Sequence, residues 1–214
     1  MNLTTVVIDP ILLAPSPATL NAEESTITGL EIETTWLPIE NMQVTFNATW
    51  NDGDVDEFND VLLEVAEPGS SVDPACDRFN LVLIEVDSCP NDRSGENLPR
   101  LPEATYFLAA QYLFDTPFGL VIPRIQASLK EDIEYCFDAS SCASGLWLED
   151  EQFDLSARIS WVSPDGKWNG AIYGNNLTDE DYIVGGTAIV DSQGSGGWNA
   201  AAPLMYGAEL KYSF

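Results

Sequence analysis

The chain has 214 residues, 45% of them hydrophobic, which is enough to form the core of one or two domains. Eight Lys and Arg residues stand against 35 Asp and Glu residues, so the formal net charge is -27. This balance excludes an ordinary nucleic-acid surface, which must neutralise phosphates with basic groups. The absence of His from the sequence excludes Ser-His-Asp and Cys-His catalysis and His-based zinc sites.

The amino terminus does not resemble a signal peptide, because residues 1–10 have no basic segment and no continuous apolar core. No run of about 18 apolar residues is present to cross a bilayer as a helix. The four cysteines form two close pairs, Cys76 with Cys89 and Cys136 with Cys142. Such local pairs indicate disulfides and an oxidising compartment; four free thiols are the alternative, and neither pair has zinc-knuckle spacing. Disulfides without an export signal lead us to expect the carboxy-terminal piece of a longer protein.

Alternation of apolar and polar residues with a period of two dominates the chain and predicts β-strands. Between Met42 and Trp50, every even position is apolar and every odd position is polar. In the central parts of the alternating segments, charged residues such as Arg124, Arg158 and Lys211 lie on the polar side. We therefore expect eight strands, at about residues 4–13, 24–37, 41–52, 102–114, 119–133, 151–163, 167–183 and 203–214.

The connections between these expected strands alternate between short and long. The short turns are at 38–40, 115–118 and 164–166, and the long loops at about 14–23, 53–101, 134–150 and 184–202. Tight turns at one end and long loops at the other are typical of antiparallel up-and-down outer-membrane barrels, in which the turns face the periplasm.

Aromatic residues cluster at both ends of the expected strands, as in the aromatic girdles of membrane barrels. The turn-side group is Trp36, Phe114, Trp161, Trp168 and Phe214, and the loop-side group is Trp50, Tyr106, Phe153 and Tyr206. The sequence thus predicts an all-β chain whose strands form part of a transmembrane barrel.

Four segments resemble motifs of the TonB-dependent outer-membrane receptors. The segment from Lys167 to Tyr182, with its Asn-Leu-Thr-Asp stretch, resembles the penultimate strand of that family. Residues 29–38 resemble its GxExE strand, residues 95–102 resemble its LPxxP loop exit, and residues 206–214 resemble its closing strand. In the closing strand, Tyr212 and Phe214 are similar to the signal that barrel-assembly machinery reads.

The resemblance implies a carboxy-terminal barrel segment, residues 1–214, of a receptor for active uptake of an iron-siderophore complex, cobalamin or an oligosaccharide. Compared with a barrel of about twenty-two strands, we expect the plug domain, the TonB box and the signal peptide to be missing. The implied partners are outer-membrane lipid and lipopolysaccharide, the missing plug and strands, and, through these, the TonB complex. The implied location is the outer membrane of a Gram-negative cell.

The resemblance also assigns roles to individual side chains. The expected lumen-facing charged wall consists of Glu31, Glu33, Arg124, Lys130, Arg158, Glu209 and Lys211. Candidate ligand contacts at the outer rim are Tyr135, Phe137, Trp147 and Trp198.

The acidic segment that begins at Asp52 invites a calcium interpretation, because hard cations bind clustered carboxylates. The EF-hand pattern fails, since Glu57 and Leu63 stand where Gly and Glu are required, which leaves a solvated acidic loop as the other interpretation. Within the loop we expect a short helix at 61–65 and a small hairpin at 79–86. Chance pairs of carboxylates are unavoidable among 35 acids, so we predict no enzymatic activity, no cofactor, and no catalytic or metal site. The alternatives are a self-contained eight-stranded membrane barrel and a secreted acidic β-sandwich adhesin.

Overall fold

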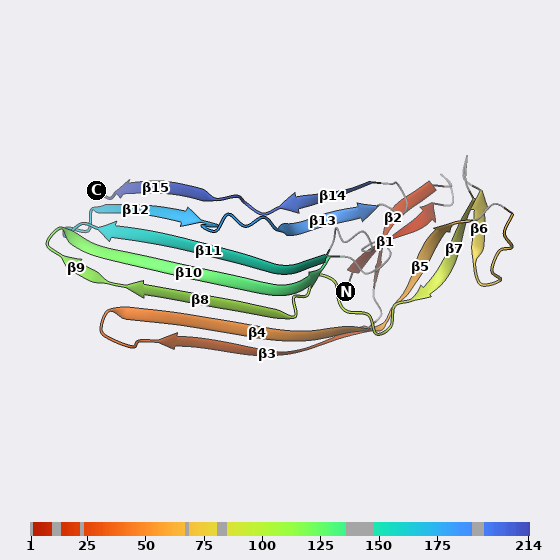
Figure 1. Cartoon of the computed structure of the whole chain (residues 1–214), viewed down its shortest axis with the longest axis horizontal. Helices are drawn as coiled ribbons and strands as arrows, with labels where there is room; N and C mark the ends of the chain where they lie inside the picture. The colour runs from red at the N-terminus through yellow and green to blue at the C-terminus, as the bar shows by residue number, and fades with distance from the viewer. Residues whose placement is uncertain are drawn as a thin grey trace.

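The computed structural model describes residues 2–9, 14–21, 24–66, 69–80, 85–135, 148–189 and 195–214. A single antiparallel sheet, which we call the wall, is its largest element. The wall has eight strands: seven follow the order β15-β12-β11-β10-β8-β4-β3, and the eighth, β9, pairs with β10 (Figure 1). Their bounds are β3 (Glu24–Trp36), β4 (Met42–Glu57), β8 (Ala104–Tyr112), β9 (Phe114–Thr116), β10 (Gly119–Glu134), β11 (Leu148–Val162), β12 (Trp168–Asn175) and β15 (Met205–Tyr212). The described residues contain no helix long and apolar enough to cross a membrane.

Smaller sheets lie at one end of the wall, which we call the loop end, and tight turns lie at the other, the turn end (Figure 1). The loop end includes the hairpin β1 (Asn2–Asp9) with β2 (Ala14–Asn21) and the hairpin β13 (Ile183–Ile189) with β14 (Ser195–Ala200). It also includes a three-stranded sheet, which we call the arm, made of β5 (Asn59–Val65), β6 (Asp77–Asn80) and β7 (Glu85–Asp92). The predicted separation of short turns from long excursions is therefore confirmed.

The prediction that residues 4–13 form a wall strand is wrong. The strand Asn2–Asp9 pairs instead with Ala14–Asn21, a segment expected to be loop. Pro15 and Pro17 lie in the second strand and lack an N–H group, so this segment is unsuited to the interior of a sheet. The other seven predicted strands are all found in the wall.

Two further predictions at the loop end are corrected. The expected helix at 61–65 is part of strand β5, whose residues pair with β7, because a short apolar run rich in Val is equally compatible with a strand. The expected strand at 167–183 is broken after Asn175, and the expected loop at 184–202 contains the β13–β14 hairpin. The predicted hairpin at 79–86 is confirmed as β6 and β7.

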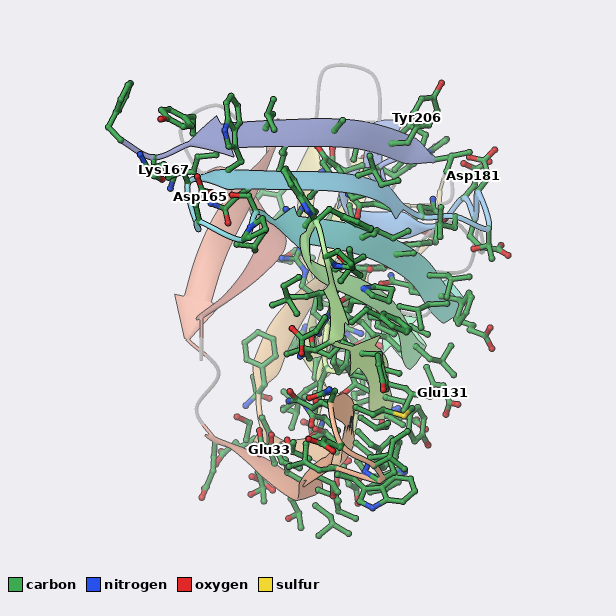
Figure 2. The ribbon with its side chains drawn as sticks, turned by 90° about the vertical axis from the view of Figure 1, so that its left-hand side faces the viewer. Glu33, Glu131, Asp165, Lys167, Asp181 and Tyr206 are labelled. Carbon is green, nitrogen blue, oxygen red and sulfur yellow. A yellow bond between two sulfur atoms is a disulfide. The ribbon has the colours of Figure 1, made fainter. Side chains whose placement is uncertain are left out.

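The wall is open rather than closed. The edges of β3 and β15 are the two ends of the strand order, with no partner among the described strands. Viewed from the turn end, the sheet curves from β15 at the top to β3 at the bottom, with Glu33 and Glu131 on opposite sides of it (Figure 2). The sandwich alternative is wrong, because Phe46, Ile159 and Leu210 are 38%, 46% and 70% exposed instead of packed between two layers.

Candidate functional site

One face of the wall is apolar along several neighbouring strands. Directly paired residues of a sheet point to the same side, so the register defines each face. One row of pairs joins Phe46 to Leu108, Ala127 and Leu155 across four strands, and another row joins Ile159 to Ile172. The exposed side chains on this face include Leu108 and Ile125 at 51% each and Ile172 at 58%. Exposed apolar side chains gathered on one face are typical of a surface that contacts lipid or another protein.

Aromatic contacts border the apolar face at both ends. At the loop end, the Trp50 and Tyr106 rings meet edge to face at 5.8 Å, and the indole N–H donates to the phenol oxygen at 3.1 Å. At the turn end, Tyr212 contacts Trp168 and Phe214, with ring centroids 4.7 and 5.1 Å apart. The girdle positions Phe153 and Trp161 are eight positions apart, which corresponds to roughly 27 Å along the strand and about 21 Å across the membrane at a 40° tilt. This height suits the apolar band of an outer-membrane barrel.

The opposite, concave face holds all seven residues that the sequence assigned to a charged wall. The register places Glu31 opposite Thr49, Glu33 opposite Asn47 and Lys130 opposite both Thr105 and Gln152. Glu209 and Lys211 pair with Ala171 and Asn169 on β12, which continue the same face. Their contact with a plug stays a prediction.

Arg158 lies at the centre of a polar row on the concave face. Its guanidinium donates to the two Glu209 carboxylate oxygens at 2.7 and 3.3 Å and lies 5.6 Å from the Tyr173 ring centroid. Its directly paired neighbour Arg124 donates to the amide oxygens of Gln126 and Gln111, each at 3.2 Å. Thus one of two opposed guanidinium groups is neutralised by a carboxylate, while the other is held by neutral groups.

The segment resembling the LPxxP loop exit packs beside the loop-end half of β4. Leu98 is buried with Val55 and Phe58, and Leu101 packs against this small core. The Leu98 N–H donates to the Gly53 carbonyl at 2.9 Å, and the Asn51 N–H donates to the Glu103 carbonyl at 2.8 Å. The segment therefore fixes the base of the arm to the wall.

The arm itself is crosslinked. Cys76 and Cys89 form a disulfide, as predicted, whereas Cys136 and Cys142 lie outside the described residues. Arg78 donates to both carboxylate oxygens of Asp87, at 2.6 and 2.7 Å. The hydrogen bond from Arg78 lowers the pKa of Asp87 below its ordinary value. The predicted calcium-like segment from Asp52 belongs instead to β4 and β5.

A cluster of polar groups at the loop end joins the β10–β11 hairpin to the start of β13. The Tyr135 hydroxyl donates to the Ile183 carbonyl at 2.8 Å, and Gln152 Nε2 donates to both of these oxygens, at 2.7 and 2.6 Å. Burial and the nearby Asp154 and Tyr135 raise the pKa of Tyr182. Of the predicted rim contacts, Tyr135 therefore bonds β13, whose partner β14 carries the exposed Trp198, while Phe137 and Trp147 lie outside the described residues.

The Asn-Leu-Thr-Asp stretch, which we call the Asn176 tie, connects the linker between β12 and β13 to the linker between β14 and β15. Asn176 is 3% exposed and has a positive φ of 48°. Its amide donates to the Glu180 and Ala202 carbonyls and accepts the Glu180 N–H, and the Leu204 N–H donates to Asp179. This tie explains why the predicted strand at 167–183 is interrupted.

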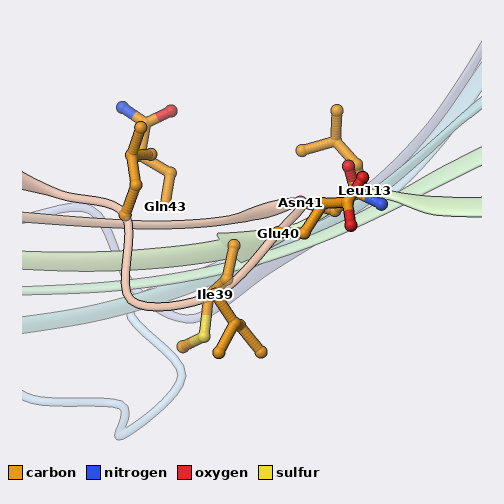
Figure 3. A pocket seen from close by; sticks show the side chains of 7 residues that line it. Ile39, Glu40, Asn41, Gln43 and Leu113 are labelled. Atoms are coloured by element: carbon orange, nitrogen blue, oxygen red, sulfur yellow. The ribbon is translucent and has the colours of Figure 1, made fainter.

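A hollow with a volume of about 430 Å³ lies at the turn end. Figure 3 shows its lining side chains, which include Ile39, Asn41 and Leu113. Its surroundings are mostly apolar, with Leu37 70% exposed. It contains none of the predicted site residues.

Comparisons with known proteins place the fold. Searches of protein-family models and of curated proteins find no match to this sequence. Among solved structures, the chain is similar to the ferric yersiniabactin uptake receptor FyuA from Yersinia pestis, with a TM-score of 0.65 and 16% identity over 92% of this chain. It is also similar to BauA, the ferric preacinetobactin receptor from Acinetobacter baumannii, with a TM-score of 0.56 and 15% identity over 100% of this chain.

The chain has the barrel-wall fold of the TonB-dependent receptors. It covers 25% and 26% of the two receptor chains, so it spans about a quarter of their length. The family resemblance inferred from the motifs is therefore confirmed at the level of the fold, and the open wall corresponds to part of a barrel. One of the similar proteins is named an uptake receptor and the other a receptor.

Sequence reasoning missed two features of the site. Gln152 was not singled out, because a lone Gln at a polar position of an alternating strand is indistinguishable from a solvated residue. The role of Asn176 was also missed, although the repeated Asn followed by acidic residues signals a turn with a positive φ.

Proposed function

We propose that this chain forms the carboxy-terminal barrel wall of a TonB-dependent outer-membrane receptor that takes up a scarce solute in a Gram-negative cell. The observation that carries the proposal is the similarity of nearly the whole chain to two receptors named for ferric siderophores. A ferric siderophore is accordingly the first candidate solute, ahead of cobalamin and an oligosaccharide.

The two faces of the wall support this assignment physically. The apolar face suits the lipid and lipopolysaccharide of an outer membrane, because lipid does not solvate charge. The edges of β3 and β15 expose unpaired backbone groups that cost several kcal/mol each in lipid. Further strands of the same receptor are the partners that satisfy these edges, and a plug facing the concave side completes the assembly.

The loop end supports a role in solute capture. Tyr135 directly follows β10 and the exposed Trp198 lies on β14, so both belong to the loop end, and Phe137 and Trp147 complete the candidate set. We propose that solute binds among these loops and that the plug then rearranges when TonB pulls. This step uses parts of the receptor beyond the wall.

Uptake by the intact receptor tests the proposal. Cells that carry the complete gene, cells that lack the coding region of this wall and cells without TonB would be compared for uptake of radiolabelled iron bound to a panel of siderophores. Cobalamin uptake and growth on oligosaccharides would be measured in parallel. The expected result is TonB-dependent uptake of one solute class that disappears with the wall. Equal uptake of every solute in all three strains would disprove the function, and in-frame coding sequence upstream would test the domain assignment.

A further inference from the structure

The β13–β14 hairpin is a sheet of its own rather than a continuation of the wall ladder. Two ties nevertheless hold it at the loop end. The first is the Asn176 tie, which joins the crossings from β12 to β13 and from β14 to β15. The second is the bonding of Ile183 to Tyr135 and Gln152, which belong to the neighbouring β10–β11 hairpin.

In the second tie, the Gln152 side chain contacts a residue that is not its partner in the strand register. Gln152 pairs in register with Lys130, five residues before Tyr135, yet its amide lies 2.7 Å from the Tyr135 hydroxyl. The same amide lies 2.6 Å from the Ile183 carbonyl. Gln152 is 7% exposed, so its two donors are largely removed from competition with water.

We propose that Gln152 is the positioning residue of a latch, defined by Tyr135, Gln152 and Ile183, that holds the β13–β14 hairpin against the β10–β11 hairpin. The latch binds at the first residue of β13, where the pairing with β14 shifts between Ile183 and Gly185. A carbonyl fixed by two donors at an irregular point of a hairpin restrains the start of that hairpin. While these bonds are formed, the start of the β13–β14 hairpin cannot move away from the β10–β11 hairpin.

The latch goes beyond the proposed uptake, because it depends on three bonds between described residues and not on any solute. It would, however, set the position of the hairpin that carries Trp198 relative to Tyr135. A ligand group that bonded the Tyr135 hydroxyl would compete with the Ile183 carbonyl for its proton. Such a ligand would weaken the Tyr135 bond to that carbonyl and leave the Gln152 bond in place.

Hydrogen–deuterium exchange of the complete receptor in outer-membrane vesicles tests the latch. The variants are Gln152→Leu, which removes both amide donors, and Tyr135→Phe, which removes only the hydroxyl. Gln126→Leu is the matched control. It makes the same Gln-to-Leu substitution on the concave face of β10, at a position outside the latch. Peptides from β13 and β14 are compared with peptides from β12 and β15.

We expect Gln152→Leu to raise the exchange of β13 and β14 amides by about tenfold and Tyr135→Phe by about threefold, with β12 and β15 unchanged, because each lost hydrogen bond lowers the cost of local opening. Gln126→Leu should leave β13 and β14 unchanged. The latch is disproved if both latch variants exchange like the wild type, or if protection falls equally throughout the wall. Because Tyr135→Phe is the milder change, it decides the outcome if Gln152→Leu fails to assemble. Solute uptake plays no part in this readout, so failure of the latch and failure of the proposed function are distinguishable.

Discussion

Arg124 and Arg158 lie directly opposite each other on β10 and β11, and the register places both on the concave face of the wall. Of these two arginines, only Arg158 has a carboxylate partner among the described residues, Glu209 at 2.7 Å. Opposed like charges destabilise a cross-strand pair. The Glu209 carboxylate therefore reduces a repulsion in addition to forming its own ion pair.

Removal of the Glu209 carboxylate should slightly destabilise the wall. We expect Glu209→Gln to lower the midpoint of heat-modified gel mobility by about 1–2 °C, because both partners are exposed and such pairs contribute little. Adding Arg124→Gln should recover most of the loss, because it removes the opposed charge. Glu33→Gln serves as the control on the same face, and an unchanged midpoint in Glu209→Gln would contradict this account.

The two faces of the wall should respond oppositely to a new charge. Ala127 and Ser128 are neighbours on β10, but Ala127 pairs with Leu108 on the apolar face and Ser128 pairs with Asp154 on the concave face. Ala127→Arg should cost about 2–4 kcal/mol near mid-membrane and reduce the assembled receptor in outer membranes. Ser128→Arg should assemble normally, because it faces Asp154. Equal assembly of both variants would show that the apolar face does not contact lipid.

The arm should lose stability in acid. Arg78 lowers the pKa of Asp87 in the folded state, so this ion pair stabilises the arm above the ordinary aspartate pKa of about 3.9. The contribution is lost as the pH falls below that value and through the lower folded pKa, because the protonated carboxyl no longer balances Arg78. Proteolysis between β5 and β7 should therefore increase from pH 4 to pH 2. Asp87→Asn should be more readily cleaved than the wild type at neutral pH and should lack this acid response; a parallel pH profile would refute the assignment.

Asn176 should be the most sensitive polar residue of the loop end. Asn176→Ala removes three side-chain hydrogen bonds and places Ala at a positive φ, which we expect to destabilise the region by about 2–4 kcal/mol. Asn176→Gly tolerates the backbone geometry and should lose somewhat less. The measurement is the amide exchange of residues 201–204, and wild-type exchange in both variants would rule out the tie.

The sequence by itself determined which side of each long strand meets an apolar surrounding. Alternation with a period of two is a local property, so the seven wall strands, the short turns and the shared face of the seven charged residues could be predicted from it. The pairing of Cys76 with Cys89 was also predictable, because the two cysteines are close in the chain.

The tertiary structure alone decided which segments meet at the loop end. Packing of Leu98 beside β4 and bonding of Gln152 to Ile183 join residues that are distant in sequence. The strand Asn2–Asp9 pairs with the neighbouring segment Ala14–Asn21 instead of joining the wall, which is a choice between two possible partners. Alternation leaves such contacts undetermined, because the same polar position suits water or a buried partner equally. Burial of the Gln152 amide beside two oxygens is a property of the assembled rim, and only the folded chain brings those three atoms together.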